Sequence, residues 1–183
     1  MTIHNFNERL SWSQGRKKGT WEDVIKSLIH GCVEVQQSDD EDDKNGVDYW
    51  ASLRSGAFIA IDLKARGTGA SRFWRFGEPE FALETWAVIP ENGLIGKTGW
   101  ALSEAKNVDY ILFAFEDTDL CYLVPFQLLR MAFVENYKIW KSQYGETFQH
   151  SQGAFQRWRS KAVFVPASVV CNAVSSQMIK KIA

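Results

Sequence analysis

Apolar and polar residues alternate along the chain with two different periods, which predicts both helices and strands. Apolar side chains recur at intervals of three and four residues in 20–31, in 125–145 and in a C-terminal stretch that opens at Pro166. This spacing is typical of helices that bury one face. Thr20 is the expected N-cap of the first helix, and Pro125 stands where the second can start.

Runs that are apolar, or that alternate between apolar and polar residues, predict the strands. A turn at 54–56 separates the run that begins at Asp48 from the next run, so these two strands are expected to pair antiparallel. Residues 145–160 are polar, and a small patch of basic and aromatic residues lies at 156–161. The predicted strands are the run after Asp48 and residues 32–36, 57–64, 81–89, 99–102, 109–115, 120–124 and 162–165.

This order of elements predicts an α/β fold, a single domain with a central mixed β-sheet flanked by helices. Residues 1–19 are polar and are expected to form an N-terminal arm, with the domain at 20–183. A chain of 183 residues, 45% of them hydrophobic, is large enough for one compact core. Its eight tryptophans are spread along the sequence, so we assign most of them to that core.

Charge and cysteine content limit the classes of function. The formal net charge is −1, so no overall basic field attracts a phosphate backbone, and any contact with nucleic acid must be local. The three cysteines lie far apart, and no signal peptide or long apolar span occurs, which predicts a cytoplasmic protein without structural zinc or disulfides and without a membrane partner.

The acidic run at 38–43 offers oxygen ligands but does not fit an EF-hand. If Asp39 is the first ligand, the required glycine falls on Lys44 and the bidentate glutamate on Trp50. We therefore expect a solvated hairpin loop. Its negative charges would repel phosphate groups that are not the target, or would mimic phosphate.

The main chemical signal is the combination of Asp48, Asp62 and Lys64. Successive side chains on a strand point to opposite faces, so Asp62 and Lys64 should share one face while Ile61 and Leu63 share the other. The antiparallel pairing brings Asp48 near Asp62. Two carboxylates can hold a hard cation such as Mg²⁺ or Mn²⁺, and a lysine can orient or deprotonate water, or neutralise a phosphate.

An Asp-x-Lys triplet also occurs by chance, and its alternative reading is a pair of solvated neighbours on an exposed sheet face. The apolar run at 57–61 leads directly into the triplet, and Asp48 stands fourteen residues before Asp62. This context favours a functional site over the solvated pair.

These residues resemble the restriction-endonuclease-like superfamily of PD-(D/E)XK nucleases. Asp48 matches the first acid of that motif, and Asp62, Leu63 and Lys64 match the D-x-K; Val47 replaces the motif's proline. The passages at 106–113 and 122–126 look like small phage and prophage members. The resemblance implies a restriction-endonuclease-like fold and magnesium-dependent hydrolysis of phosphodiester bonds in nucleic acid, with DNA expected rather than RNA.

Further residues extend the predicted site. The resemblance implies an additional acid on the preceding helix, for which Glu22 is the candidate; its alternative role is to stabilise the helix N-terminus. Glu84 would add a carboxylate if its strand lies beside that of Asp62. Next to Phe73 and Trp74, which suit base stacking, arginines are the candidates for contact with nucleic acid: Arg66, Arg72 and Arg75.

Three functional hypotheses follow. The first is a metal-dependent nuclease with Asp48 and Asp62 as metal ligands and Lys64 as a catalytic residue, supplemented by Glu22 or Glu84. The second is a catalytically silent protein of the same fold that binds another protein as a regulator or phage counter-defence inhibitor, favoured by the weak basic character. The third is a nuclease subunit that acts only as an oligomer, such as a homodimer.

Overall fold

The structure is a computed structural model, and it describes residues 3–5, 20–67, 69–91, 93–116, 118–152 and 157–179. Contacts divide the chain into two compact units. One unit comprises residues 15–73 and 105–127. We call it the motif unit because it contains the Asp-x-Lys triplet. The second unit comprises residues 1–14, 74–104 and 128–183.

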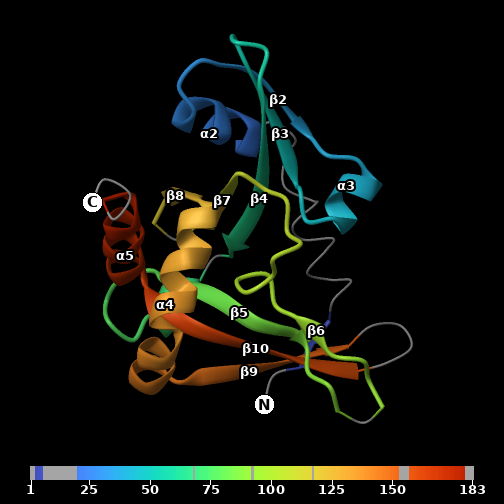
Figure 1. Ribbon diagram of the computed structural model, residues 1–183, viewed down its shortest axis with the longest axis vertical. Coiled ribbons are helices and arrows are strands. Elements are labelled where there is room, and N and C mark those ends of the chain that lie inside the picture. The colour runs from blue at the N-terminus through green and yellow to red at the C-terminus, as the bar shows by residue number, and fades with distance from the viewer. Residues whose placement is uncertain are drawn as a thin grey trace. The chain divides into compact units, whose positions relative to one another are not determined.

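A five-stranded mixed sheet forms the centre of the motif unit (Figure 1). Its neighbours pair antiparallel except for β4 and β7, which run parallel. The strands in spatial order are β2 (Cys32–Gln37), β3 (Tyr49–Leu53), β4 (Phe58–Arg66), β7 (Tyr110–Phe115) and β8 (Leu120–Pro125).

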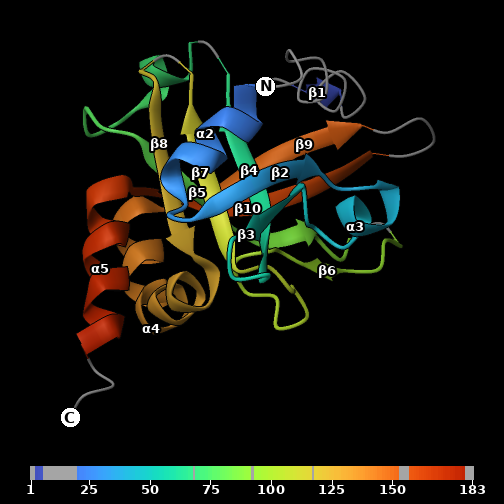
Figure 2. The same ribbon diagram turned by 90° about the horizontal axis from the view of Figure 1, so that it is seen from above.

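Helix α2 (Thr20–Leu28) covers one face of this sheet (Figure 2). It buries Trp21 and Ile25, together with Ile29 just beyond its end, against apolar side chains of three strands. The burial of a contiguous apolar cluster is the main favourable contribution to the stability of such a layer. The partners on the strands are Tyr49, Ala51, Ile61, Leu112 and Ala114.

The second unit contains another five-stranded sheet. Its strands in order are β1 (Ile3–Asn5), β9 (Glu146–Gln152), β10 (Arg157–Pro166), β5 (Glu80–Val88) and β6 (Lys97–Thr98), and β1 pairs with β9 in parallel. Helix α5 (Ala167–Ile179) packs on β10 and β5. It also contacts α4 (Phe126–Tyr144), where Gln177 Nε2 donates to Glu135 Oε2 at 2.5 Å.

The predicted fold class, an α/β protein with a mixed sheet and flanking helices, is confirmed. The second sheet was not predicted. Of the expected N-terminal arm, residues 1–2 and 6–19 lie outside the described part of the chain, and Ile3–Asn5 forms β1. The domain predicted at 20–183 covers parts of both units and stays a prediction. No helix in the described residues is long and apolar enough to span a membrane.

Two local predictions are wrong, and strand pairing in a third region was not predicted. The acidic run contains a short helix, α3 (Asp40–Lys44), because Asp39 caps it and acidic residues suit a helix N-terminus. Residues 99–102 form a turn that follows β6: the amide of Leu102 donates to the carbonyl of Gly99, while the amide of Ala101 donates to that of Glu84. The polar region at 145–160 contains β9 and the start of β10, because strands at a surface can pair through their backbones without an apolar pattern.

Replacing Ile25 by alanine should lower the free energy of unfolding by about 2–5 kcal/mol, because the side chain is fully buried in the cluster under α2. Leu28→Ala on the same helix is the matched control, since Leu28 is 41% exposed and should cost much less. Urea denaturation of both variants measures the difference. Equal losses would contradict the assignment of Ile25 to the core.

Candidate functional site

The β3–β4 hairpin places Asp48 beside Asp62. Asp48 directly precedes β3, and its backbone amide donates to the carbonyl of Ile61 at 2.8 Å. Its carboxylate oxygen Oδ2 accepts from the amide of Leu63 at 2.5 Å. The side chain of Asp48 is therefore held by the backbone of the strand that carries Asp62.

The alternation predicted for β4 is present. Ile61 is buried in the cluster under α2, and Leu63 packs against that cluster. Asp62 and Lys64 project from the other side of the strand, where Lys64 Nζ lies 2.6 Å from Asp62 Oδ1. The solvated alternative does not describe Asp62, because this residue is only 1% exposed.

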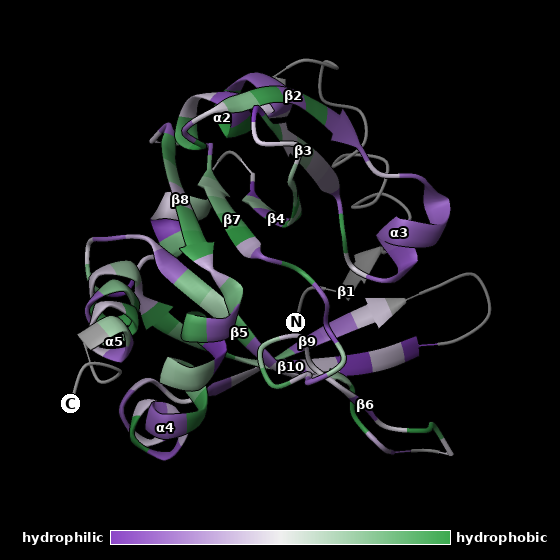
Figure 3. Cartoon of the chain, turned by 45° about the horizontal axis from the view of Figure 1, so that its top comes forward, coloured by the Kyte–Doolittle hydropathy of each residue, from purple (hydrophilic) through white to green (hydrophobic). Residues whose placement is uncertain are grey.

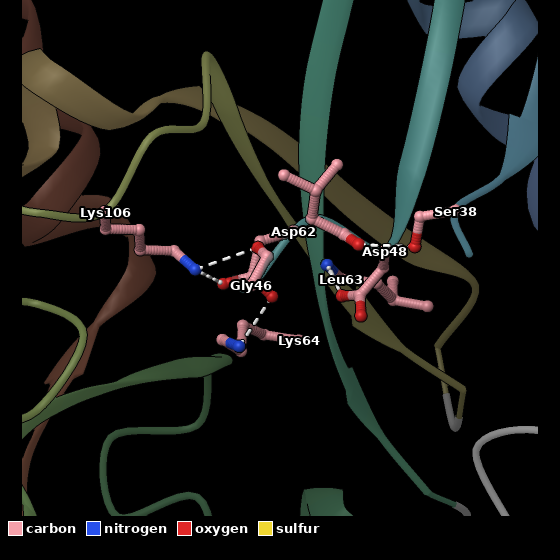
Figure 4. Close-up of polar contacts among 8 residues, drawn as sticks. Ser38, Gly46, Asp48, Asp62, Leu63, Lys64 and Lys106 are labelled. Atoms are coloured by element: carbon pink, nitrogen blue, oxygen red, sulfur yellow. Dashed lines mark hydrogen bonds and ion pairs between the residues drawn. The ribbon is translucent and has the colours of Figure 1, made fainter. Parts of the chain in front are cut away.

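A second lysine, Lys106, completes the surroundings of Asp62 (Figure 4). Its Nζ lies 2.8 Å from Asp62 Oδ2 and donates to the carbonyl of Gly46 at 3.0 Å. Sequence reasoning did not find Lys106. It is an isolated basic residue shortly before β7, and only the parallel pairing of β4 with β7 brings it to Asp62.

Burial and charge determine the protonation of Asp62. Burial alone would raise the pKa of its carboxyl, but the charges of Lys64 and Lys106 outweigh this effect and hold the pKa below its usual value. Asp62 is therefore ionised at neutral pH.

Asp48 has the opposite electrostatic behaviour. Burial, and next the negative charge of Asp62, raise the pKa of Asp48 from 3.8 to about 7, although Lys64 and the amide of Leu63 counteract them. Near neutral pH the group can take up or release a proton. Once ionised, Asp48 places a second negative charge beside that of Asp62. A bound cation would neutralise both charges.

The acidic helix α3 positions the segment that leads to Asp48. The carboxylate of Asp39 accepts from the amides of Glu41 and Asp42 at 3.0 and 2.9 Å, and Trp50 Nε1 donates to Asp42 Oδ2 at 2.8 Å. Figure 3 shows α3 as a hydrophilic helix, and none of its residues is buried. Asp39 thus caps the helix, and Asp42 anchors it to Trp50 of β3.

Ser38 also holds the segment that leads to Asp48. Its amide donates to the carbonyl of Asp48 at 2.9 Å, and its hydroxyl donates to the carbonyl of Val47 at 2.5 Å. Val47, which replaces the proline of the resembled motif, is 4% exposed. Hydrogen bonds from Ser38 thus hold the backbone at Val47 and at Asp48.

Glu22 acts electrostatically on Tyr49, the residue that follows Asp48. Burial, then the charge of Glu22 and that of Asp48, raise the pKa of Tyr49 to about 12. The phenol of Tyr49 therefore stays neutral. Tyr49 packs in the cluster under α2, on the face of the sheet opposite Asp62, and a part for Glu22 in catalysis stays a prediction.

The structure gives no support to Glu84 as a ligand of the same cation. That role depended on its strand lying beside that of Asp62, but the neighbours of β4 are β3 and β7. Glu84 lies on β5, between β10 and β6 in the sheet of the second unit.

The three arginines predicted to contact nucleic acid differ in their surroundings. Arg75 in the second unit donates to Glu80 Oε1, the carbonyl of Tyr144 and that of Phe164 at 2.7–2.9 Å, which gives it a structural role. In the motif unit, Arg72 is exposed and its guanidinium lies 5.5 Å from the ring centroid of Phe73, which is 73% exposed. Arg66 ends β4.

The donor set fits a magnesium ion. The contact of Lys106 with Asp62 Oδ2 is an ion pair without hydrogen-bond geometry, so this buried oxygen has no hydrogen-bond partner. The described residues contain no group of three or more His, Cys, Asp or Glu side chains that could hold a metal. Two carboxylates suffice for Mg²⁺, which usually keeps several waters and binds substrate phosphates as well.

No protein-family model and no curated protein matches this chain. Comparison with solved structures finds a bacterial homing endonuclease, I-Ssp6803I, at 13% sequence identity and a TM-score of 0.42. The match covers 60% of this chain and 65% of that chain. Membership of the PD-(D/E)XK superfamily stays a prediction from the motif.

Asp48→Asn should increase the stability of the metal-free protein at neutral and alkaline pH. The folded-state pKa of about 7 exceeds the ordinary 3.8, so the stabilisation from the bound proton is complete below that lower value and is lost as pH rises through about 7. Asparagine keeps an acceptor for the amide of Leu63 and carries no charge. The free energy of unfolding of Asp48→Asn should exceed that of the unmodified chain by about 1–3 kcal/mol above neutral pH.

The measurement is urea unfolding with a chelator present, at several pH values across this range. An advantage for Asp48→Asn that does not change with pH would contradict the raised pKa of Asp48.

Proposed function

We propose that the chain is a magnesium-dependent hydrolase of phosphodiester bonds in nucleic acid, with DNA as the expected substrate. The observation that carries this proposal is the convergence of Asp48, Asp62 and Lys64 on one β-hairpin. Mn²⁺ has the same preference for hard oxygen ligands and would replace Mg²⁺.

Asp48 and Asp62 would hold the metal ion. A bound Mg²⁺ would supply positive charge that polarises the phosphodiester and favours ionisation of an attacking water. Asp62 is ionised already, whereas Asp48 would give up its proton on binding a cation. Cation binding therefore relieves the repulsion between the two carboxylates.

Lys64 would act on the phosphate as a cation. Its ammonium contacts Asp62 and can donate hydrogen bonds to phosphoryl oxygens. The side chain is 33% exposed, so substrate can reach it. In hydrolysis the water oxygen bonds to phosphorus as the bond to the leaving oxygen breaks, and the ammonium stabilises the charge that develops on the phosphoryl oxygens.

The exposed Arg72 and Phe73 would contact the nucleic acid. Because the net charge is near zero, binding has to depend on such local contacts. The guanidinium can pair with a backbone phosphate and the aromatic ring can stack on an unpaired base. They lie in the same compact unit as the acidic residues.

Purified protein should cleave DNA in the presence of Mg²⁺ or Mn²⁺ and lose this activity in excess chelator. Asp48→Asn is the most informative variant, because it should be inactive while being more stable than the unmodified chain at neutral pH. Lys64→Met should lower the rate by about 100-fold or more, since it removes a charge that acts on the transition state.

Single- and double-stranded DNA and RNA should be compared as substrates. Lys26→Met, an exposed residue of α2, is the control and should retain full activity. Metal-dependent cleavage that survives both Asp48→Asn and Lys64→Met would refute the assignment of the site.

A second candidate function is a regulator of the same fold that binds another protein. The exposed acidic helix α3 and the net charge of −1 favour it, because such a surface suits a basic partner protein. This function predicts that calorimetry detects no binding of Mg²⁺ or Mn²⁺ to the purified chain. It also predicts a complex that is lost when Asp40 and Asp43 are replaced by asparagine.

A further inference from the structure

The two lysines that contact Asp62 differ in their exposure. The side chain of Lys64 is 33% exposed, whereas that of Lys106 is 8% exposed. Lys106 also donates to the carbonyl of Gly46, so its ammonium connects the β4 carboxylate to the turn before Asp48. Figure 4 shows Lys106 and Lys64 approaching Asp62 from different directions.

The turn at Gly46 has a shape that fits this ammonium. A Cβ atom at Gly46 would lie 2.5 Å from Lys106 Nζ, which is too close for both groups to remain in place. Gly46 also has φ of +85°, a conformation that other residues rarely adopt. Glycine is therefore needed here both for the backbone and for the space that Lys106 occupies.

We infer that Lys106 is a second functional lysine of the site, a positioning residue that holds Asp62 against the Gly46 turn. The inference rests on the proposed function, in which Asp62 is a metal ligand and Lys64 contacts phosphate. A buried ammonium that loses its carboxylate partner is costly, so Lys106 stays in place.

Partners that orient a metal ligand typically contribute about 10- to 100-fold to metal affinity or activity. Lys106→Met keeps the length and apolar part of the side chain and removes the ammonium. We expect it to weaken the binding of Mn²⁺ by about 10-fold or more, as measured by calorimetry.

Gly46→Ala offers an independent route, because it leaves Lys106 in the sequence but displaces its ammonium. Gly56→Ala is its matched control: Gly56 also has φ of +85°, and nothing lies within 4 Å of the Cβ that would be added there. Both glycines have the same φ, so a loss of Mn²⁺ affinity in Gly46→Ala beyond that in Gly56→Ala reports the displacement of Lys106. Thermal unfolding of each variant verifies that it is folded during the titration.

Weaker Mn²⁺ binding in Lys106→Met and in Gly46→Ala, but not in Gly56→Ala, would support the positioning role. Unchanged or tighter Mn²⁺ binding in Lys106→Met would overturn the positioning role. The ammonium of Lys106 would then either have no effect on metal binding or compete with the metal ion. If the unmodified chain binds no Mn²⁺ at all, the proposed function itself fails. These outcomes separate the failure of the inference from that of the function on which it rests.

Discussion

The charge on Asp62 is the constraint on which the site depends. The carboxylate is 1% exposed and lies on the central strand of a five-stranded sheet, where an unpaired charge would be strongly destabilising. Lys64 from the same strand and Lys106 from the segment before β7 contact one oxygen each. Asp62 can therefore be both buried and ionised.

The surroundings of Asp48 are a consequence of that charge. Asp48 follows a capped acidic helix and a glycine turn, and the amide of Leu63 fixes its carboxylate next to Asp62. Burial together with repulsion by Asp62 raises the pKa of Asp48 to about 7. Two carboxylates at this proximity destabilise the folded chain at neutral pH, which is typical of residues that serve function more than stability.

Much of the fold around the site could be predicted from sequence because its signals are local. The turn at 54–56, the alternation in β4 and the apolar stripe of α2 each arise from neighbouring residues. Where local signals were weak, the predictions failed or were missing: like charges at 38–43 concealed the cap by Asp39, and polar residues at 145–160 concealed strand pairing through the backbone. The chain's grouping into two compact units depends on contacts distant in sequence.

The sequence by itself determined that Asp62 and Lys64 share a face of a strand and that Asp48 returns to meet them, since strand alternation and a short turn require no other information. Only the tertiary structure decided that Asp62 is buried and that Lys106 reaches it. It also showed that Glu84 belongs to a strand of another sheet. The physical reason is that strand order and burial depend on contacts between residues far apart in the chain.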